Sequence, residues 1–572
     1  MGWRNTGVWT AALCGILCLL FAVISWRAVV HKSYIIDEAG DAYAAAEFFH
    51  DHDFRNHPDL APLWVDFIAL GRPLASASRD SAVGKYQDIR YVDSARKMAL
   101  VLGVGLAIMI AWWSWNLGGA AAAVTATFLY CFDPNFLGHA ALAKNDVGES
   151  LCFVAASYSL WQLGRRWTWP RAVASCLIIG AAVTAKFSGI LSLALLIPIL
   201  GIRAILPQPW LIRREPVQSR RLRLAVAAGT CLATLLATYL MIWASYDFRF
   251  AAGPNGEELD MAPFLHQLRH EDLRVRLGRE PTDKESADWR PPTLARIVFA
   301  LDRKRLLPQA WATGFIYTEA DQTRHRNYFF GQVYMYHRNW LYFPAAIAMK
   351  CPLATITAIV AALLALAGNH RVFQRAENQW TLAAFAIPPL VYLAVSMHSY
   401  LNIGVRHVFP VYPFVFIAVG LGVARLWEHH AARLPLCALA GVLIVETLSA
   451  FPNYIAFFNV ACRSDEIKLL SDSNLDWGQD LPLLADWQKG HAKTTVYLDY
   501  FGSADPAEYG VRSVDIRKPL ARPPAEPSVL AVSATYLQLH HFDRAAFKKL
   551  GVQRPDSPLA ILGGTIYLFT VR

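Results

Sequence analysis

The sequence predicts an α-helical polytopic membrane protein with a small extracytoplasmic α/β domain at its C-terminus. Three observations lead to this fold class. Of the 572 residues, 55% are hydrophobic, only 17% are charged, and the apolar residues gather in long runs. Soluble globular domains contain roughly 25% charged residues. This composition excludes a disordered chain, a coiled coil and a nucleic-acid-binding protein.

The net charge of +10 fits a membrane protein better than a nucleic-acid partner. Lys and Arg residues accumulate in the cytoplasmic loops of such proteins. The nine cysteines offer no Cys-x-x-Cys pair and no framework spacing, so neither a zinc site nor a disulfide scaffold is indicated.

The membrane spans follow from the apolar runs, because a spanning helix needs about 20 mostly apolar residues. These runs predict eleven spans, at 8–30, 97–115, 118–137, 147–163, 171–187, 188–206, 223–244, 341–367, 379–397, 407–426 and 435–455. The first run lacks a small-residue cleavage site, so we expect an uncleaved anchor.

The stretch 171–206 forms either one long span or a hairpin of two short spans, and the basic residues favour the hairpin. With two spans, the short loops on one side carry thirteen arginines, whereas those on the other side carry only Lys144, Lys186 and Arg406. The thirteen are Arg165, Arg166, Arg171, Arg203, Arg213, Arg214, Arg220, Arg221, Arg223, Arg371, Arg375, Arg425 and Arg433. This asymmetry predicts a cytoplasmic N-terminus.

With this orientation, three large segments face outside. We therefore expect a transmembrane domain at 1–455, with outer loops 31–96 and 245–340, and an extracytoplasmic α/β domain at 456–572. Alternating apolar residues in the last domain predict strands at 494–501, 528–536 and 560–571. A helix is expected from Trp477 through Trp487.

The candidate acids lie just beyond the outer ends of helices, while the spans are almost free of Asp and Glu. Asp37 and Glu38 follow the first span, where adjacent carboxylates could supply a general base and a second binding group. Asp37 could equally cap the helix that follows it. Asp146 precedes an apolar run, and on local sequence alone helix capping is the better explanation for it.

Two of the outer cations are candidate phosphate ligands. Lys186 interrupts the fifth and sixth spans at their outer turn, where it could bind a lipid phosphate or extend to the interface. The planar fork of Arg406 matches a pair of phosphate oxygens, and the scarcity of outer cations argues against a decorative role.

Two further features receive no firm role. The loop 245–340 could cover the site and shape an acceptor channel, or it could be a solvated loop with interfacial aromatic residues. Lys350 lies about ten residues into the eighth span, where a buried charge is costly. Pro352 follows closely, so we expect a kink or cavity there.

Several motifs together resemble the polyprenyl-phosphate-sugar-dependent glycosyltransferases of the protein mannosyltransferase (family 39-like) superfamily, which have the GT-C fold. The resemblance is carried by Asp37-Glu38, the outer turn from Asp133-Pro134 through His139 to Asp146, and Thr184-Ala185-Lys186-Phe187. It is also carried by residues 327–353, NIGVRHVFPVYPF at 402–414, FPNYIAFFN at 451–459 and SDSNLDWGQDL at 471–481.

The resemblance implies roles for five residues. Asp37 would be the catalytic base with Glu38 beside it, Asp146 a second acid, and Lys186 and Arg406 the cations on the lipid phosphate. These residue types suit the chemistry, since a base must deprotonate the acceptor while a phosphate leaves. The SNLDWGQDL string receives no chemical role; a structural role, packing the C-terminal domain onto the membrane core, is open.

The sequence thus predicts an integral membrane glycosyltransferase of a bacterial inner membrane. It would use a polyprenyl-phosphate sugar donor and a glycan, lipid or protein acceptor on the outer face, among membrane lipids and without nucleic acid. Neither the sugar nor the acceptor is identified, and no cofactor is specified, with a divalent metal ion left open. A secondary transporter or flippase of a lipid-linked substrate is the alternative, but neither inverted repeats nor midplane polar residues are evident. A non-catalytic scaffold would leave the outer charges unexplained.

Overall fold

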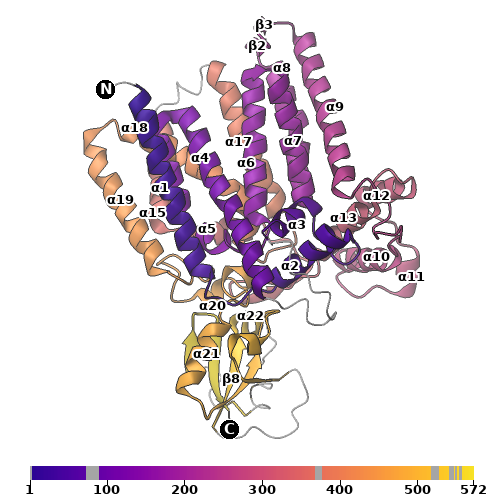
Figure 1. The fold of residues 1–572 in the computed structure, drawn as a ribbon, viewed down its shortest axis with the longest axis vertical. Coiled ribbons are helices and arrows are strands. Elements are labelled where there is room, and N and C mark those ends of the chain that lie inside the picture. Colours follow the sequence, from indigo (N-terminus) through magenta and orange to yellow (C-terminus); the bar gives the residue numbers. More distant parts are fainter. Residues whose placement is uncertain are drawn as a thin grey trace.

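The computed structural model describes residues 3–71, 89–367, 376–516, 527–539, 547, 551–552 and 557–571. Its main body is a bundle of long helices, shown in Figure 1 with the N-terminus at one end and a small sheet beyond the other. Within the described residues, seven helices are long and apolar enough to cross a membrane, or eight if one bent pair counts as a span. The chain is therefore an integral membrane protein.

The bundle contains a helix at each of the eleven predicted spans. The long helices are α1 (Trp3–Val29), α4 (Ile89–Cys131), α6 (Asp146–Arg165), α7 (Trp169–Ala185), α8 (Ile190–Ile205), α9 (Arg220–Ser245), α15 (Leu353–Ala367), α17 (Ala376–Met397), α18 (Tyr412–Leu426) and α19 (His430–Ser449). The α4 range holds two predicted spans, because the chain breaks at Gly119, whose φ is +73°. The Tyr130 hydroxyl donates to the Gly103 carbonyl at 2.8 Å, so the two arms lie antiparallel.

The predicted hairpin at 171–206 is confirmed. Helices α7 and α8 are separated by the short helix η3 (Phe187–Gly189), and Lys186 lies at the turn. The predicted span 341–367 is different from the expectation, since α14 (Tyr342–Lys350) and α15 meet at 110°. The residues between them are Cys351 and Pro352, and a proline cannot continue the hydrogen bonding of a helix. A kink was therefore expected there, but a bend this sharp was not.

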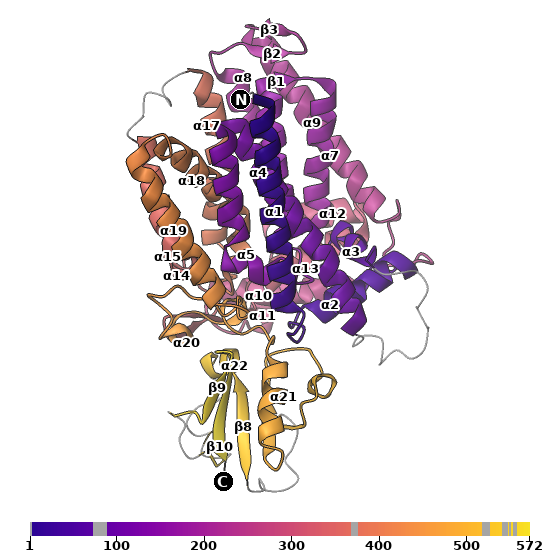
Figure 2. The ribbon, with the colours of Figure 1, turned by 60° about the vertical axis from the view of Figure 1, so that its left-hand side comes forward.

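The three segments predicted to face outside lie at one end of the bundle, which we call the outer end (Figures 1 and 2). The first contains α2 (Glu38–Ala46), η1 (Glu47–Asp51) and α3 (Pro62–Ala69), and the second contains α10 (Ala262–Leu277), α11 (Asp283–Ala287), α12 (Thr293–Arg303), α13 (Gln309–Asp321), β4 (Asn327–Phe329) and β5 (Gln332–Tyr334).

The opposite end carries the arginine-rich loops with β1 (Arg166–Trp167), β2 (Trp210–Ile212) and β3 (Glu215–Val217), and we call it the arginine-rich end. Two of the thirteen arginines, Arg371 and Arg375, fall outside the described residues. The relative sidedness of loops and segments therefore agrees with the charge pattern.

The C-terminal sheet stands beyond the outer end (Figures 1 and 2). In the described part of the chain it has five strands in the order β7-β6-β8-β10-β9, with β6 parallel to both of its neighbours and β10 antiparallel to both of its own. The strands are β6 (Thr495–Asp499), β7 (Ser513–Asp515), β8 (Ser528–Ser533), β9 (Ala560–Leu562) and β10 (Ile566–Val571). Every residue of β8 is buried.

The short helices of this region are α20 (Glu466–Leu469), η5 (Asp472–Asn474), α21 (Leu481–Gly490), η6 (Pro506–Tyr509) and α22 (Ala534–Gln538). Two expectations need correction. The run 560–571 is a hairpin and not one strand, because Gly563 and Gly564 turn the chain with φ of +61° and +80°. The helix expected from Trp477 begins only at Leu481, after Gly478 adopts a φ of +89°.

Candidate active site

Four of the five predicted site residues meet at the outer end. Arg406 belongs to η4 (Val405–Val411), the short helix that leads into α18. Its Nη1 contacts the Asp146 carboxylate at 3.1 Å, and its Nη2 lies 3.9 Å from the Asp37 carboxylate. Lys186 contacts Asp146 from the other side, with 2.6 Å between Nζ and Oδ1. The cluster thus joins the first outer loop, the start of α6, the α7–α8 turn and η4.

Asp146 does not cap its helix, contrary to the local explanation. The N-cap of α6 is Asn145, and Asp146 is the first helical residue. Its two carboxylate oxygens instead accept from Lys186 and Arg406. Glu149 lies three residues further along, on the same helical face, and contacts Lys186 Nζ at 2.9 Å. The ammonium of Lys186 therefore lies between two buried carboxylates.

Asp37 is the most accessible acid of the cluster, with 31% of its side chain exposed, against 3% for Asp146 and 5% for Glu149. It occupies the N-cap position of α2 but makes no capping hydrogen bond. Its carboxylate faces Lys144 at 3.4 Å and, at 3.9 Å, Arg406. A partly exposed carboxylate beside two cations is accessible to a bound molecule.

Lys144 was counted among the outer cations but given no role, and the structure brings it beside Asp37. Its Nζ also contacts Asp41 at 3.3 Å. Burial opposes the charge of Lys144, yet the carboxylates of Asp37 and Asp41 outweigh it and hold the lysine pKa above its ordinary value. Burial raises the pKa of Asp41 to about 7, although Lys144 acts in the opposite direction.

Glu38 differs from its neighbour because it is fully buried. Its two oxygens accept from Arg96, with an Nη2–Oε2 distance of 2.6 Å and an Nε–Oε1 distance of 2.9 Å. The same carboxylate accepts from the Ala143 amide at 2.8 Å. Glu38 was expected to act beside the catalytic base, but in the structure its carboxylate oxygens are already occupied by donors of the protein. The contacts fix the first outer loop to α4 and to the segment before α6.

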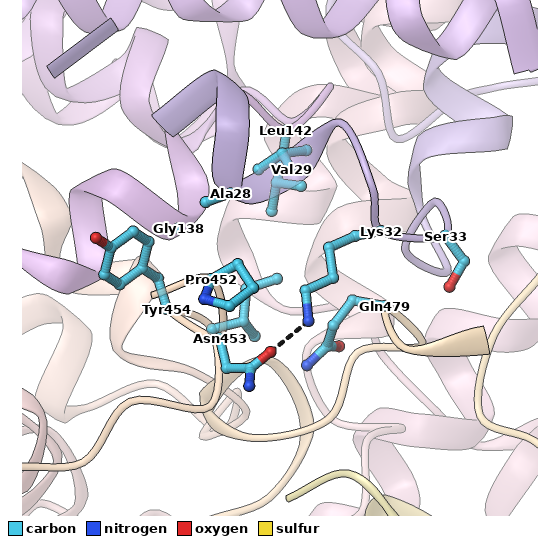
Figure 3. A pocket seen from close by; sticks show the side chains of 11 residues that line it. Ala28, Val29, Lys32, Ser33, Gly138, Leu142, Pro452, Asn453, Tyr454 and Gln479 are labelled. Atoms are coloured by element: carbon cyan, nitrogen blue, oxygen red, sulfur yellow. Dashed lines mark hydrogen bonds between the residues drawn. The ribbon is translucent and has the colours of Figure 1, made fainter. Parts of the chain in front are cut away.

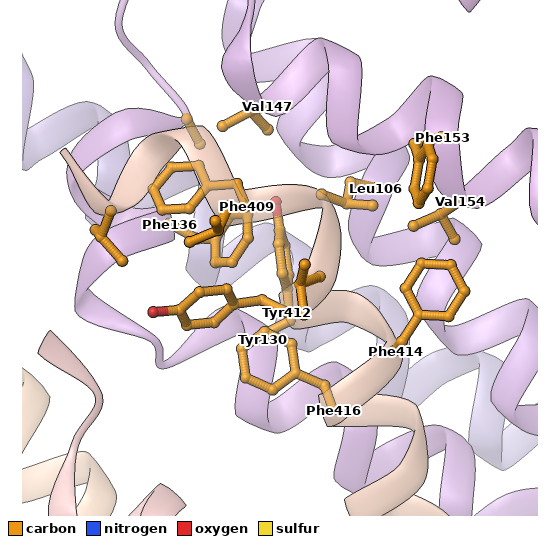
Figure 4. Close-up of a cluster of buried hydrophobic side chains, with 14 of the residues drawn as sticks. Leu106, Tyr130, Phe136, Val147, Phe153, Val154, Phe409, Tyr412, Phe414 and Phe416 are labelled. Atoms are coloured by element: carbon orange, nitrogen blue, oxygen red, sulfur yellow. The ribbon is translucent and has the colours of Figure 1, made fainter. Parts of the chain in front are cut away.

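The cluster rests on a layer of packed aromatic side chains, several of which appear in Figure 4. Phe409, one helical turn after Arg406, stacks on Phe136 with ring centroids 4.6 Å apart. Phe136 in turn contacts Tyr412 and Phe416. Close packing of this kind tolerates little change in volume, so the backbone beneath Arg406 is held firmly.

The SNLDWGQDL string, which received no chemical role from the sequence, lies against the cluster. Ser473 Oγ accepts from Arg406 Nε at 3.0 Å, and the Trp477 ring lies 4.3 Å from the guanidinium carbon of the same arginine. Only its contacts in three dimensions show this, since 67 residues separate Ser473 from Arg406.

The first outer loop is also joined to the C-terminal segments. Lys32 contacts both Asn453 and Asp480, and Figure 3 shows its side chain pointing toward Asn453 with Gln479 alongside. The backbone of Ser33 donates to the Gln479 carbonyl at 3.0 Å. These contacts hold the loop that carries Asp37.

The described residues contain no group of three or more His, Cys, Asp or Glu side chains that could hold a metal ion. The acids of the cluster face lysine and arginine instead of one another.

No family model matches the sequence, and no curated protein matches it. Among solved structures, the Saccharomyces cerevisiae protein O-mannosyltransferase Pmt1-Pmt2 complex bound to the sugar donor matches 77% of this chain and 90% of that chain, with 10% identity and a TM-score of 0.53. This likeness confirms the expected GT-C fold.

Two other solved structures are similar at lower TM-scores. Oligosaccharyltransferase AglB from Archaeoglobus fulgidus, in complex with an inhibitory peptide and a dolichol-phosphate, matches 91% of this chain with 12% identity and a TM-score of 0.46. ArnT from Cupriavidus metallidurans bound to undecaprenyl phosphate matches 98% of both chains, with 16% identity and a TM-score of 0.27. The chain spans 55 to 62% of the length of the archaeal oligosaccharyltransferase chains.

Proposed function

We propose that this chain, a membrane protein with the GT-C fold, is a glycosyltransferase that moves a sugar from a polyprenyl-phosphate carrier to an acceptor at the outer end of the bundle. One observation carries the proposal. An accessible carboxylate, Asp37, lies 3.9 Å from Nη2 of a buried arginine, at the boundary between membrane helices and outer segments. A donor with a lipid tail and a polar head group needs a site at such a boundary.

In the proposed reaction Asp37 takes the proton of the acceptor hydroxyl or amine. The acceptor atom forms a bond to the anomeric carbon of the sugar while the bond from that carbon to the phosphate oxygen breaks. The phosphate leaves with the electron pair, so negative charge develops on it. A single displacement of this kind inverts the anomeric centre.

The leaving phosphate is assigned to the cations beside Asp37. In the described part of the chain, Nη2 of Arg406 makes only the 3.9 Å contact with Asp37, so this nitrogen has hydrogen-bonding capacity for a phosphate oxygen. Lys144 lies on the other side of Asp37. Donors held in place before the reaction stabilise developing charge without reorganisation.

Lys186 and Asp146 are proposed to support Arg406 without contacting the leaving phosphate directly. Lys186 is held by Asp146 and Glu149, and Asp146 also holds Nη1 of Arg406. This arrangement sets the direction of the arginine fork and balances its charge. We therefore assign Asp146 to positioning Arg406, and Lys186 to supporting Asp146 at the edge of the phosphate site.

The second outer segment is proposed to form the acceptor side. Trp311 of α13 contacts Phe187, the neighbour of Lys186, with ring centroids 6.0 Å apart. Gly314 fits closely against both Phe187 and the Pro58 carbonyl, which a Cβ at that position would approach to 2.1 Å. Helix α13 thus packs beside the cluster as a wall.

The test is turnover of a labelled polyprenyl-phosphate sugar by the purified protein in liposomes, followed as loss of label from the lipid. Asp37→Asn should lower kcat by about 10²- to 10⁴-fold, the usual contribution of a general base. Asp465→Asn, which changes an outer acid with a 53% exposed side chain, is the matched control and should leave kcat unchanged. Unchanged turnover in Asp37→Asn would refute the base, and flux of intact donor without turnover would favour a transporter.

A further inference from the structure

The string at residues 471–480, SDSNLDWGQD, lies outside the membrane helices and precedes α21 of the C-terminal sheet region. We infer that this segment belongs to the donor-phosphate site, where Ser473 and Trp477 are positioning residues that hold Arg406. The inference rests on the proposed function, because it assigns the arginine to a lipid phosphate. It gives the C-terminal region a part in binding the donor.

The two residues fix the guanidinium from different directions. Ser473 Oγ accepts from Nε at 3.0 Å, and the Trp477 ring stacks at 4.3 Å from the guanidinium carbon. Asp146 holds Nη1. Nε, Nη1 and the face of the guanidinium therefore have protein partners before any ligand binds, and Nη2 faces Asp37. An arginine held in this way loses less conformational freedom when a phosphate binds.

Ser473 is itself held in register with the arginine loop. Its hydroxyl donates to the Ile403 carbonyl at 3.0 Å, and the side-chain oxygen of Asn474 accepts from the Val405 amide at 2.9 Å. At Gly404 an added Cβ would lie 2.0 Å from Ser473 Oγ. The absence of a side chain at Gly404 therefore makes room for the serine beside Arg406.

Trp477 is held on the side of the catalytic loop. The Ile36 amide, next to Asp37, donates to the Trp477 carbonyl at 3.1 Å. The Gly478 carbonyl accepts from Ser33 Oγ at 2.8 Å. Gly478 itself has a φ of +89°, and a Cβ there would approach the Phe501 carbonyl oxygen to 2.5 Å. One segment thus fixes both the loop of Asp37 and the fork of Arg406, and so sets the separation between acid and cation.

If the 471–480 segment only anchored the C-terminal region to the helix bundle, its contacts with α14 and α22 would suffice. Lys350 Nζ donates to the Asn474 carbonyl at 2.6 Å, and the Asp476 carboxylate accepts from the Thr535 amide at 3.0 Å. These contacts join the segment to α14 and to α22. The serine hydroxyl and the indole face the guanidinium instead, which is where a phosphate-binding role requires them.

The experiment measures the Kd of undecaprenyl phosphate for the full chain in nanodiscs, with undecaprenol as the matched lipid that lacks the phosphate. Trp477→Leu should weaken undecaprenyl phosphate binding about 10- to 30-fold, the range for a desolvated cation–π contact. Ser473→Ala should weaken it about 10-fold, since a hydrogen bond to a charged group is lost. Binding of undecaprenol should stay unchanged in both variants.

A double-mutant cycle separates positioning from structure. If Trp477 acts through Arg406, adding Trp477→Leu to Arg406→Gln should cause no further loss of undecaprenyl phosphate affinity. Equal losses in the wild-type and Arg406→Gln backgrounds would overturn the inference. Trp487→Leu, which removes an indole of α21 that stacks on His491, is the matched control and should leave the Kd unchanged.

Trp477→Phe keeps an aromatic face and most of the volume, so it tests the inference if the leucine variant fails to fold. We expect a loss of about threefold, because indole is the best cation–π partner among the aromatic rings. Wild-type affinity in both Ser473→Ala and Trp477→Phe would overturn the inference while leaving the proposed function intact. If the wild-type chain binds undecaprenyl phosphate no better than undecaprenol, the proposed function itself fails.

Discussion

Two arginines at opposite ends of the bundle are almost equally buried, with 5% of Arg203 and 6% of Arg406 exposed. At the arginine-rich end, Arg203 donates to the backbone carbonyls of Gly164, Gln208 and Pro209. At the outer end, Arg406 contacts carboxylates and a hydroxyl from distant parts of the chain.

The two arginines differ in their partners and not in their burial, so the partners indicate whether a buried cation can bind a ligand. A guanidinium whose nitrogens all bond to neutral carbonyls ties helix ends together and has little left to offer a ligand. A guanidinium held by a carboxylate and a hydroxyl, with one nitrogen that makes no hydrogen bond among the described residues, can still donate to an anion.

Not every charge at the outer end is available to a ligand. Glu38 lies there too, but it is fully buried against Arg96 and should act on stability. Glu38→Gln leaves the buried Arg96 without its carboxylate, so we expect the free energy of unfolding to fall by about 3–5 kcal/mol. Denaturant unfolding in detergent micelles measures the change. Glu258→Gln removes an exposed partner of Arg305 and should cost less than about 1 kcal/mol. Equal effects in the two variants would contradict the structural assignment of Glu38.

The difference between the two buried arginines is tested by replacing each with glutamine. Arg406→Gln should raise the Kd of undecaprenyl phosphate about 10- to 100-fold, the range for hydrogen bonds to charged groups. Arg203→Gln should lower the thermal midpoint of unfolding and leave that Kd unchanged, because its partners are structural carbonyls. Binding assays in nanodiscs and a thermal scan give both values. A comparable loss of phosphate binding in Arg203→Gln would show that the two ends do not differ in this way.

The last prediction concerns the pH dependence of stability, which should arise from two buried acids at the outer end. Burial raises the pKa of Asp476 to about 7 and that of Asp472 to about 6, from ordinary values of 3.8. The folded chain therefore keeps protons that the unfolded chain has released, and stability falls as the pH rises from about 4 to 7. We expect a lower thermal midpoint at pH 8 than at pH 5. Asp476→Asn should flatten this dependence, and an unchanged slope would contradict the assignment.

The helical layout could be predicted because it follows from length, hydropathy and the side on which cations fall. The α7–α8 hairpin is the clearest case, since only two spans preserve the asymmetry of the arginines. The bend of 110° between α14 and α15 was not predicted in size, because Pro352 indicates a break without its angle. The hairpin at Gly563 and Gly564 was missed because the apolar pattern continues through it.

The candidate site could be predicted only in part. Asp37, Asp146, Lys186 and Arg406 stood out because charges are rare at the outer helix ends, and they do meet. Local capping rules misjudged Asp146, whose neighbour Asn145 occupies the N-cap position instead. Ser473 and Trp477 lie in the SDSNLDWGQDL string that carried the resemblance, but their contact with Arg406 was not predicted, since the arginine lies about 70 residues away and no local pattern joins them.

The contact between Ser33 and Gly478 joins positions 445 residues apart. Because synthesis runs from the N-terminus, a ribosome makes the first loop long before the 471–480 segment. The acid and its supported arginine therefore cannot be assembled until the membrane helix α19 is in place and the segment after it has reached the outer end. A nascent chain that lacks the 471–480 segment carries Asp37 without Ser473 and Trp477, so the proposed site is completed only after this segment has been made.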